Sequence, residues 1–268
     1  MGNSVVSLPE LGNGVRAKSL TLRIERDLCY ECAHDVVAAV RHLIARPTDE
    51  IVVELGSVNM VDSSGLRALL TSQAMCEEAG VGFRLTRISD CVDRIIRLSG
   101  LGHLLGLPEM DHAAYSHRPG VCLGPAVWKT YEHVAASNPA LISVLRDKIT
   151  SAADAAGADG DALCDIKIAA GEALTNAYRH GSPDKGVSKI EVRCMTCSAA
   201  FVVEVEDEGA PFDPNATPEP DPKKLQDNGM GIFLMREAMD VVEFSSSGSG
   251  NTVRMVKWLS REHPPQGI

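Results

Sequence analysis

The sequence predicts an α/β protein built from two domains, and three observations carry this prediction. The chain has 268 residues, which is enough for two domains that each bury their own core. In its first part, strand-like apolar runs alternate with helical patterns, as in a layered α/β domain with a largely parallel sheet. In its second part, helices come first and strands follow, which is typical of an α+β domain whose helices cover one face of an antiparallel sheet.

The first part is expected to hold three strands and three helices. Alternating or continuous apolar runs predict the strands, and apolar residues spaced three and four apart predict the helices. Pro47 and Gly80 follow the first two helices, at places where proline stops a helix and glycine caps its end. The expected strands cover residues 19–24, 51–55 and 82–88, and the expected helices cover residues 33–46, 63–79 and 91–100.

The second part begins after a segment that has no apolar period. Proline and glycine punctuate "PEMDHAAYSHRPGVCLGP" at 108–125, which predicts a linker between a domain at 1–107 and a domain at 126–262. Beyond it, the same periodicity arguments apply. The expected helices cover residues 126–136, 138–157, 162–181 and 231–242, and the expected strands cover residues 189–194, 200–209 and 251–259.

Composition argues against several classes of partner. The formal net charge of −10 argues against direct binding of nucleic acid, whose phosphates attract clustered Lys and Arg. No uncharged apolar run approaches the roughly 20 residues that cross a membrane, and the first residues do not resemble a signal peptide. We therefore expect a cytoplasmic protein that contacts no membrane, although "MGNSVVS" loosely fits a myristoylation pattern.

The spacing of cysteines and histidines indicates no familiar metal site. Two C-x-x-C pairs, Cys29/Cys32 and Cys194/Cys197, are too far apart in the chain for a zinc ribbon. Small buried side chains are the favoured interpretation, and metal or redox use is the alternative. Three histidines at 103, 112 and 117 have a spacing that fits a solvated linker better than a metal site.

The stretch "VDSSGLRALL" at 61–70 has two interpretations. Asp62, Ser63 and Ser64 precede a helical pattern, and Asp and Ser favour helix starts because their side-chain oxygens accept backbone N–H groups. Gly65 would let the chain turn tightly there. Alternatively, one serine is a substrate, since the N-terminus of a helix tolerates a phosphate.

A polar stripe is predicted on the helix at 162–181. Glu172, Asn176 and His180 are spaced by four residues, so they lie along one side of the helix. The rest of that helix is largely apolar, and a polar stripe there is costly unless it faces a cleft or a ligand.

An aspartate and three glycines complete the predicted nucleotide site. Asp207 ends an apolar strand just before the turn at Gly209, where a carboxylate can accept a hydrogen bond from an exocyclic amine. Gly229 and Gly231 precede the last expected helix, where unpaired N–H groups and the helix dipole favour phosphate.

In this order and spacing, the motifs resemble those of the GHKL ATPase superfamily, and within it the serine-kinase anti-sigma factors. The similar segments span about residues 120–262 and include "EALTNAYRH", "DEGAPFDP", "GMGIFLMREAMDVVEF" and "NTVRMVK". The resemblance implies binding of ATP and Mg²⁺. It assigns Mg²⁺ to Asn176, the adenine amine to Asp207, the phosphates to the lid glycines Gly229 and Gly231, and the base or its water to Thr252.

The resemblance also implies that Glu172 is the general base that accepts the proton of a target hydroxyl. A histidine kinase is the less favoured alternative, because it needs an acceptor histidine in a helical hairpin and His133 in "YEHVAASNP" is the one candidate. Another alternative is a module that holds nucleotide without transferring phosphate.

The first part is similar to the STAS domain of anti-sigma-factor antagonists over about residues 15–107. The similarity rests on "VDSSGLRALL", on "IVVEL" before it and on "RIIRLSGLGHLLGL". It implies that Ser63, directly after the aspartate, is the phosphoacceptor, with Ser64 beside it. Where many such domains have a Gly-Glu-Leu-Asp turn, this chain has "ERDLCYE", so the docking surface around the acceptor departs from the family pattern.

Together, the two resemblances predict a partner-switching regulator. The kinase part would bind either a sigma factor or a STAS-domain antagonist, and phosphorylation would decide which partner is held. The acceptor would be Ser63 in the same chain, Ser63 in a second chain of a homodimer, or a serine of a separate antagonist. The alternative is a non-catalytic nucleotide-binding scaffold joined to an unphosphorylated STAS sensor domain.

Overall fold

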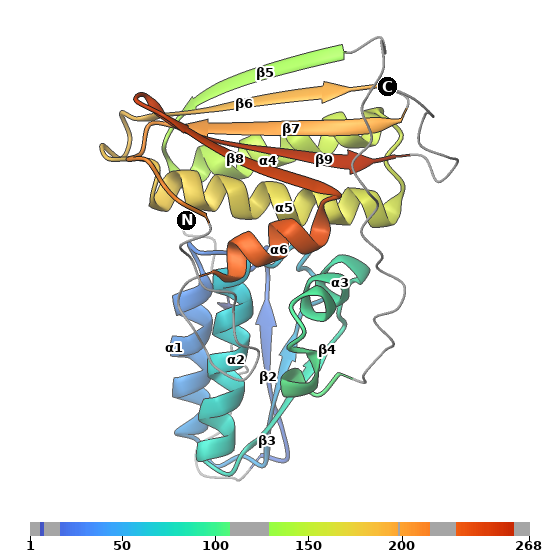
Figure 1. The fold of residues 1–268 in the computed structure, drawn as a ribbon. Coiled ribbons are helices and arrows are strands. Elements are labelled where there is room, and N and C mark those ends of the chain that lie inside the picture. Colours follow the sequence, from blue (N-terminus) through green and yellow to red (C-terminus); the bar gives the residue numbers. More distant parts are fainter. Residues whose placement is uncertain (1–5, 8–16, 108–128, 198, 215–228, 260–268) are drawn as a thin grey trace. The chain divides into compact units, whose positions relative to one another are not determined.

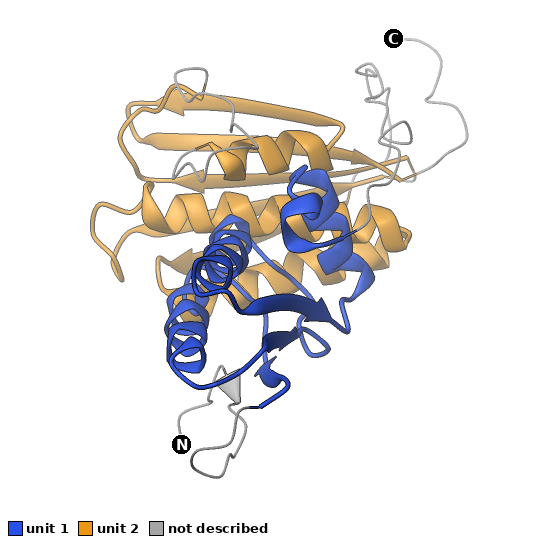
Figure 2. Ribbon diagram, turned by 90° about the horizontal axis from the view of Figure 1, so that it is seen from below, with its two compact units in different colours: residues 1–111, 222–225 blue, residues 112–221, 226–268 orange. Residues whose placement is uncertain are grey.

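The chain divides into two compact units, which Figure 2 distinguishes by colour. The computed structural model describes residues 6–7, 17–107, 129–197, 199–214 and 229–259. Residues 6–107 of this set belong to the first unit and residues 129–259 to the second. The expected linker at 108–125 and the myristoylation pattern lie outside the described residues.

The first unit is a four-stranded sheet with helices packed on it (Figure 1). Its strand order is β1-β2-β3-β4, in which β2, β3 and β4 are parallel and β1, which the periodicity did not predict, is antiparallel to β2. The elements are β1 (Val6–Ser7), β2 (Leu20–Ile24), α1 (Ala33–Ile44), β3 (Glu50–Glu54), α2 (Ser63–Glu78), β4 (Gly82–Thr86), α3 (Asp90–Leu98) and the 3₁₀ helix η1 (Gly102–Leu105).

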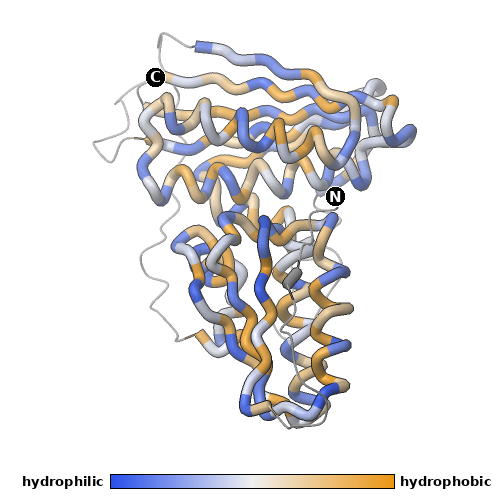
Figure 3. Tube along the Cα trace, turned by 180° about the vertical axis from the view of Figure 1, so that it is seen from behind, coloured by the Kyte–Doolittle hydropathy of each residue, from blue (hydrophilic) through white to orange (hydrophobic). Residues whose placement is uncertain are grey.

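Apolar periodicity explains these elements. Leu20, Leu22 and Ile24 are buried at alternate positions of β2, whereas β3 has three consecutive buried residues, as expected for a central parallel strand. α1 and α2 pack against each other, and each turns an apolar side inward (Figure 3). The predicted strands and helices of this unit are therefore confirmed to within a few residues.

The second unit is a five-stranded antiparallel sheet of order β5-β6-β7-β9-β8, with α4 and α5 on one face (Figure 1). α5 contacts β6, β7 and β9 and also packs against α6. The elements are β5 (Lys129–Ala136), α4 (Pro139–Ala155), α5 (Gly160–Arg179), β6 (Lys189–Thr196), β7 (Ala200–Asp207), α6 (Met230–Ala238), β8 (Val241–Ser247) and β9 (Gly250–Trp258).

Two expected helices of the second unit were wrong in type or length. The segment at 126–136 was predicted to be a helix, but residues 129–136 form β5, which pairs with β6 along its whole length. Most of β5 is exposed, so pairing with a neighbouring strand, and not its own periodicity, decides its conformation. The helix predicted at 231–242 ends at Ala238, and Val241 begins the unpredicted strand β8.

A row of alternating charges crosses the sheet from edge to edge. Glu132, Arg193, Glu204, Arg254 and Glu243 occupy directly paired positions on β5, β6, β7, β9 and β8. Arg193 lies 2.9 Å from Glu132 and 3.0 Å from Glu204, and Arg254 lies 3.7 Å from Glu204 and 3.9 Å from Glu243. Cross-strand pairs of opposite charge favour this pairing of the strands.

A nearly buried ion pair joins α5, β9 and the end of α6. Lys257 Nζ lies 2.5 Å from Asp165 Oδ2 and donates to the carbonyl oxygen of Ala238 at 2.7 Å. The Asp165 side chain is 2% exposed and the Lys257 side chain 16%. Burial of both charges makes each dependent on the other, because water cannot replace the lost partner.

We predict that Asp165→Ala lowers the free energy of unfolding by about 1–3 kcal/mol, because Lys257 loses its shorter ion pair in a site largely closed to water and keeps the longer one to Asp240 Oδ2 at 4.0 Å. Urea denaturation of the full chain measures this value. Asp154→Ala, at an exposed position of α4, is the matched control and should change it by less than about 0.5 kcal/mol. Equal stability of the two variants would contradict the role of this ion pair.

Candidate functional site

Three residues of the predicted nucleotide site meet where α6 packs on α5. Glu172 and Asn176 lie one turn apart on α5, as their spacing predicted. A methyl group added at Gly231 of α6 would lie 2.6 Å from Glu172 Oε2 and 3.5 Å from Asn176 Nδ2. Glu172 is fully buried and Asn176 is half-buried. The N-terminal part of α6 therefore covers these two polar side chains.

The carboxylate of Asp207 is held at the end of β7. Its Oδ1 accepts hydrogen bonds from the Gly209 N–H at 2.8 Å and from Asn251 Nδ2 at 3.0 Å. Among the described residues these bonds use one carboxylate oxygen, and the other oxygen faces the backbone of Gly181. A carboxylate oxygen has two acceptor positions, so this group can accept a further hydrogen bond from a ligand amine.

Glycines allow three backbone segments to approach Asp207. A methyl group at Gly181 would lie 2.1 Å from Asp207 Cγ, and one at Gly209 would lie 2.6 Å from Gly181 Cα. At Gly250, where φ is +154°, a methyl group would lie 1.7 Å from the Asp207 carbonyl oxygen. The sequence analysis singled out Gly209 but gave Gly181 only as a helix end, and it missed Gly250.

Asn251 is a further site residue that the sequence analysis missed. Its Nδ2 donates to Asp207 Oδ1 and to the Ala210 carbonyl oxygen, each at 3.0 Å, and its Oδ1 accepts from the Ser246 hydroxyl at 2.7 Å. Thr252, the predicted neighbour of the base, follows it in β9 and pairs with positions of β7 and β8. The position of Asn251 directly before Thr252 was the signal available in the sequence.

His180 marks the end of α5. Its N–H donates to the Asn176 carbonyl oxygen at 2.8 Å, and the residue is largely exposed. Partial desolvation of its ring, together with the cations Arg179 and Lys185, holds the pKa of His180 below its usual value despite the opposing effect of Asp207. At neutral pH the imidazole is therefore uncharged beside Asp207, and its contact with a nucleotide remains a prediction.

Gly229 shapes the start of α6. It is the N-cap residue with φ +99°, a left-handed conformation that favours glycine, and no side chain caps the helix. Its carbonyl oxygen accepts the Phe233 N–H at 2.9 Å. The first N–H groups of α6 are therefore suited to an anionic group, as the sequence predicted for phosphate.

The predicted phosphoacceptor lies at the first turn of α2. Asp62, which is 1% exposed, caps this helix, with Oδ1 accepting the Gly65 N–H and Oδ2 accepting the Tyr30 N–H, each at 2.9 Å. Ser63 is the first helical residue and is partly exposed, so it is not the capping residue. Gly65 is helical, not a turn residue: a methyl group there would lie 2.1 Å from the Leu28 carbonyl oxygen.

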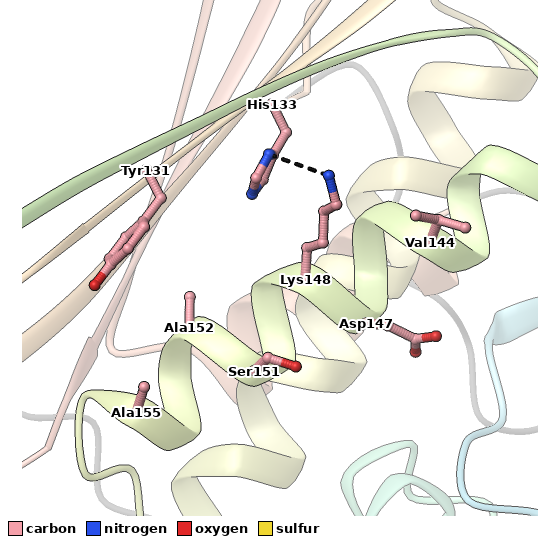
Figure 4. A pocket seen from close by; sticks show the side chains of 8 residues that line it. All are labelled: Tyr131, His133, Val144, Asp147, Lys148, Ser151, Ala152 and Ala155. Carbon is pink, nitrogen blue, oxygen red and sulfur yellow. Dashed lines mark hydrogen bonds between the residues drawn. The ribbon is translucent and has the colours of Figure 1, made fainter.

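A separate pocket of about 430 Å³ lies between β5 and α4 (Figure 4). It is lined by Tyr131, His133 and Lys148 among others, and Lys148 Nζ lies 3.4 Å from His133 Nδ1. Partial burial and the Lys148 cation lower the pKa of His133. His133 belongs to a strand and not to the helical hairpin that a histidine-kinase acceptor requires.

The described residues provide neither a membrane span nor a preassembled metal cluster. No helix among them is both long and apolar enough to cross a bilayer. No group of three or more His, Cys, Asp or Glu side chains within the described ranges could hold a metal ion. Cys194 and Cys197 are buried, as the favoured interpretation of the second C-x-x-C pair predicted.

Comparison with known families assigns each half of the chain. Residues 135–257 match the family described as histidine kinase-like ATPase domain, and residues 14–107 match the family described as Mlab, STAS domain. The serine-protein kinase RsbW of Bacillus velezensis is 32% identical over 139 residues, which cover 49% of this chain and 86% of that protein. RsbW of Bacillus subtilis is 31% identical, over 47% of this chain and 83% of that protein.

Solved structures align with parts of the chain at low identity. A crystal structure of the RsbU and RsbW domains of a Mycobacterium tuberculosis protein is 17% identical with a TM-score of 0.39, covering 52% of this chain and 34% of that one. The anti-sigma factor antagonist SpoIIAA in its unphosphorylated form is 16% identical with a TM-score of 0.29, covering 35% of this chain and 82% of that one. This chain thus spans about a third of the length of the first structure.

We predict that Gly209→Ala lowers the free energy of unfolding by about 1–3 kcal/mol, because the new methyl group would lie 2.6 Å from the backbone Cα of Gly181, which cannot move aside as a side-chain end can. Gly160→Ala, at the first position of α5 with open space around it, should leave stability unchanged or raise it by about 0.4–1 kcal/mol. Urea denaturation compares the two variants. A Gly209→Ala chain as stable as the parent would contradict the close approach of these two backbone segments.

Proposed function

We propose that this chain, which belongs to the RsbW-like serine-protein kinases and carries a STAS domain before its kinase domain, transfers the γ-phosphate of ATP to a serine of a STAS domain. The observation that carries the proposal is the grouping of Glu172, Asn176 and Gly231 where α5 meets the start of α6. It supplies a carboxylate, an amide and a helix N-terminus in one place, which suits a hydroxyl proton, a metal and phosphates.

The nucleotide would lie along the side of α5 that carries this group. Asp207 would accept a hydrogen bond from the adenine amine, because Asn251 and the Gly209 N–H already fix its carboxylate. Thr252, Gly209 and His180 would surround the base. Gly229 would bring the first N–H groups of α6 to the phosphates, where no capping side chain competes for them.

Mg²⁺ fits this arrangement through Asn176. Mg²⁺ prefers oxygen ligands and is often bound by one or two protein groups together with substrate phosphates, which suits a site where no cluster of acidic residues gathers among the described ranges. When bound, the ion would neutralise charge on the phosphates. Asn176 would present its amide oxygen from α5, and Glu172, one turn away, would remain available for the acceptor.

Transfer needs a base and an open path to it. The serine oxygen would attack the γ-phosphorus, its proton would pass to the Glu172 carboxylate, and the bond from the γ-phosphorus to the bridging oxygen would break to release ADP. Glu172 is fully buried next to Gly231, so the first turn of α6 must move before a serine reaches it. A non-catalytic nucleotide-binding scaffold is the second candidate, and this burial is the observation that favours it.

Partner switching follows from having both domains in one chain. The kinase domain would bind a sigma factor or a STAS domain in the cytoplasm, and tethering would keep the STAS domain of this chain at an effective concentration of about millimolar. A phosphate on Ser63 would add about −1.5 to −2 charges to a chain whose net charge is −10. Repulsion would then favour release of the STAS domain and binding of the other partner.

We predict that Glu172→Gln slows phosphoryl transfer by roughly 10²–10⁴-fold, because the amide keeps the shape of the side chain but cannot accept the proton. ATP should still bind, whereas Asp207→Ala should lose most ATP affinity. Calorimetry measures binding, and incorporation of labelled phosphate measures transfer. A Glu172→Gln chain with the parent rate would mean that Glu172 is not the base.

We predict that Ser63→Ala abolishes phosphorylation of the STAS domain, because no other residue would present its hydroxyl at the same place. Ser64→Ala is the matched control, since Ser64 is also partly exposed in the first turn of α2 and should leave the phosphate on Ser63. Phosphosite mapping by mass spectrometry after incubation with Mg-ATP shows which serine carries the phosphate in each variant. Phosphate found on other residues alone would refute Ser63 as the acceptor.

A further inference from the structure

Cys29 and Cys32 face each other across a tight turn that leads into α1. The Cys32 N–H donates to the Cys29 carbonyl oxygen at 3.0 Å, which closes a four-residue turn. Such a turn places its first and last Cα atoms within about 7 Å, and a disulfide needs a Cα separation of about 4.4–6.8 Å. Both cysteines are in the free thiol form, and the turn brings them into the range that a disulfide requires.

Hydrogen bonds with the backbone surround the Cys32 sulfur. The Cys29 N–H donates to Cys32 Sγ at 3.3 Å, and the Cys32 thiol contacts the Asp27 carbonyl oxygen at 3.1 Å. A hydrogen bond from the Cys29 thiol to Cys32 lowers the pKa of Cys32 to about 7, and the nearby Arg26 cation adds to this effect. The same hydrogen bond, with burial, raises the pKa of Cys29. The pair thus loses its first proton near neutral pH.

Accessibility distinguishes this pair from the other C-x-x-C pair. Cys29 is partly exposed, so a small reagent can reach it, while Cys32 is fully buried behind it. Cys194 is buried in the sheet, and burial raises its pKa to about 12. Reactive cysteines need thiolate character and access to solvent; here Cys32 supplies the first and Cys29 the second, and the hydrogen bond between them lets the proton pass from one sulfur to the other.

The turn is bonded to the start of α2. The Tyr30 N–H donates to Asp62 Oδ2 at 2.9 Å, and Asp27 Oδ1 accepts the N–H groups of Asn59 and Met60, each at 3.0 Å. The cysteine turn and the segment before Ser63 therefore hold each other in place through backbone N–H groups that donate to the Asp62 and Asp27 carboxylates.

We propose that Cys29 and Cys32 form a redox-active dithiol whose disulfide is a modification that loosens the N-terminal end of α2. Oxidation would take the Cys32 sulfur from the Asp27 carbonyl oxygen towards Cys29, which removes one contact that holds Asp27, the residue whose carboxylate accepts the N–H groups of Asn59 and Met60. A further consequence, slower phosphorylation of Ser63, rests on the proposed function. The formation of the disulfide does not rest on it.

The oxidant in this proposal is a hydroperoxide. After the pair loses one proton, the Cys32 thiolate takes the proton of the Cys29 thiol through the hydrogen bond between them. The accessible Cys29 sulfur then attacks a peroxide oxygen as the thiolate, and the O–O bond breaks to give a Cys29 sulfenic acid and hydroxide. The Cys32 sulfur then attacks the Cys29 sulfur and displaces the sulfenic oxygen as a second hydroxide, and the two protons from the thiols convert both hydroxides to water. With hydrogen peroxide, two thiols and one peroxide give one disulfide and two waters.

The experiment treats the reduced full chain with hydrogen peroxide, blocks remaining thiols and maps peptides by mass spectrometry. We expect Cys29 and Cys32 to become linked with loss of two hydrogens and to return to thiols with dithiothreitol. Cys194 and Cys197 should stay reduced and be recovered in the alkylated form. Hydrogen–deuterium exchange should become at least threefold faster at Tyr30, Asn59 and Met60 in the oxidised chain. Cys29→Ser should show neither change, and the control Cys164→Ser should show both.

Two results would contradict the proposed dithiol. Absence of the 29–32 disulfide at peroxide levels that oxidise free cysteine in the same tube would overturn it, as would a disulfide that leaves exchange at residues 59–62 unchanged. Ser63 phosphorylation is measured separately on both forms, with an expected loss of at least threefold on oxidation. If Ser63 is never phosphorylated, Ser63 is not the acceptor of the proposed function, while the disulfide and exchange measurements still decide the dithiol.

Discussion

The close approach of three backbone segments around one carboxylate is the constraint on which the second unit depends. The end of β7, the segment after α5 and the start of β9 meet at Asp207, and glycine at 181, 209 and 250 makes this possible. Asn251 then ties the carboxylate to β9 through one hydrogen bond. Hydrogen bonds within the chain already orient this group, which in the proposed function would reduce the entropy lost when a nucleotide binds.

The two halves of α6, at the Glu172 end of the site, differ in how deeply they are buried. The buried residues of α6 are Leu234, Met235 and Ala238, all in its second half, whereas its first turn rests on Glu172 through Gly231. The C-terminal part of α6 is therefore anchored in the core, whereas residues 230–233 are only partly buried. A carboxylate held by hydrogen bonds at Asp207 and a partly buried first turn of α6 thus occur within one domain; in the proposed function the first would bind the base and the second would cover Glu172.

Sequence patterns predicted the elements that burial determines and missed those that tertiary pairing determines. The spacing of Glu172 and Asn176 on α5 needed only helical geometry, and the family resemblance supplied their roles, which stay predictions. β5 was mistaken for a helix because its exposed residues carry no clear period until β6 pairs with it. Asn251 was missed because its partners are distant in the chain, and no local pattern shows that Asp207 and Ser246 lie beside it.

The row of charges across the second sheet favours one register between its strands. A strand that slid by two residues would keep the same side chains facing the helices, so burial alone penalises this error weakly. The slide would however set Arg193 opposite Thr130 or Val134 of β5 instead of Glu132. Each correct opposite-charge pair favours the native alignment by about 0.2–1 kcal/mol, so the surface charges help to reject misaligned sheets during folding.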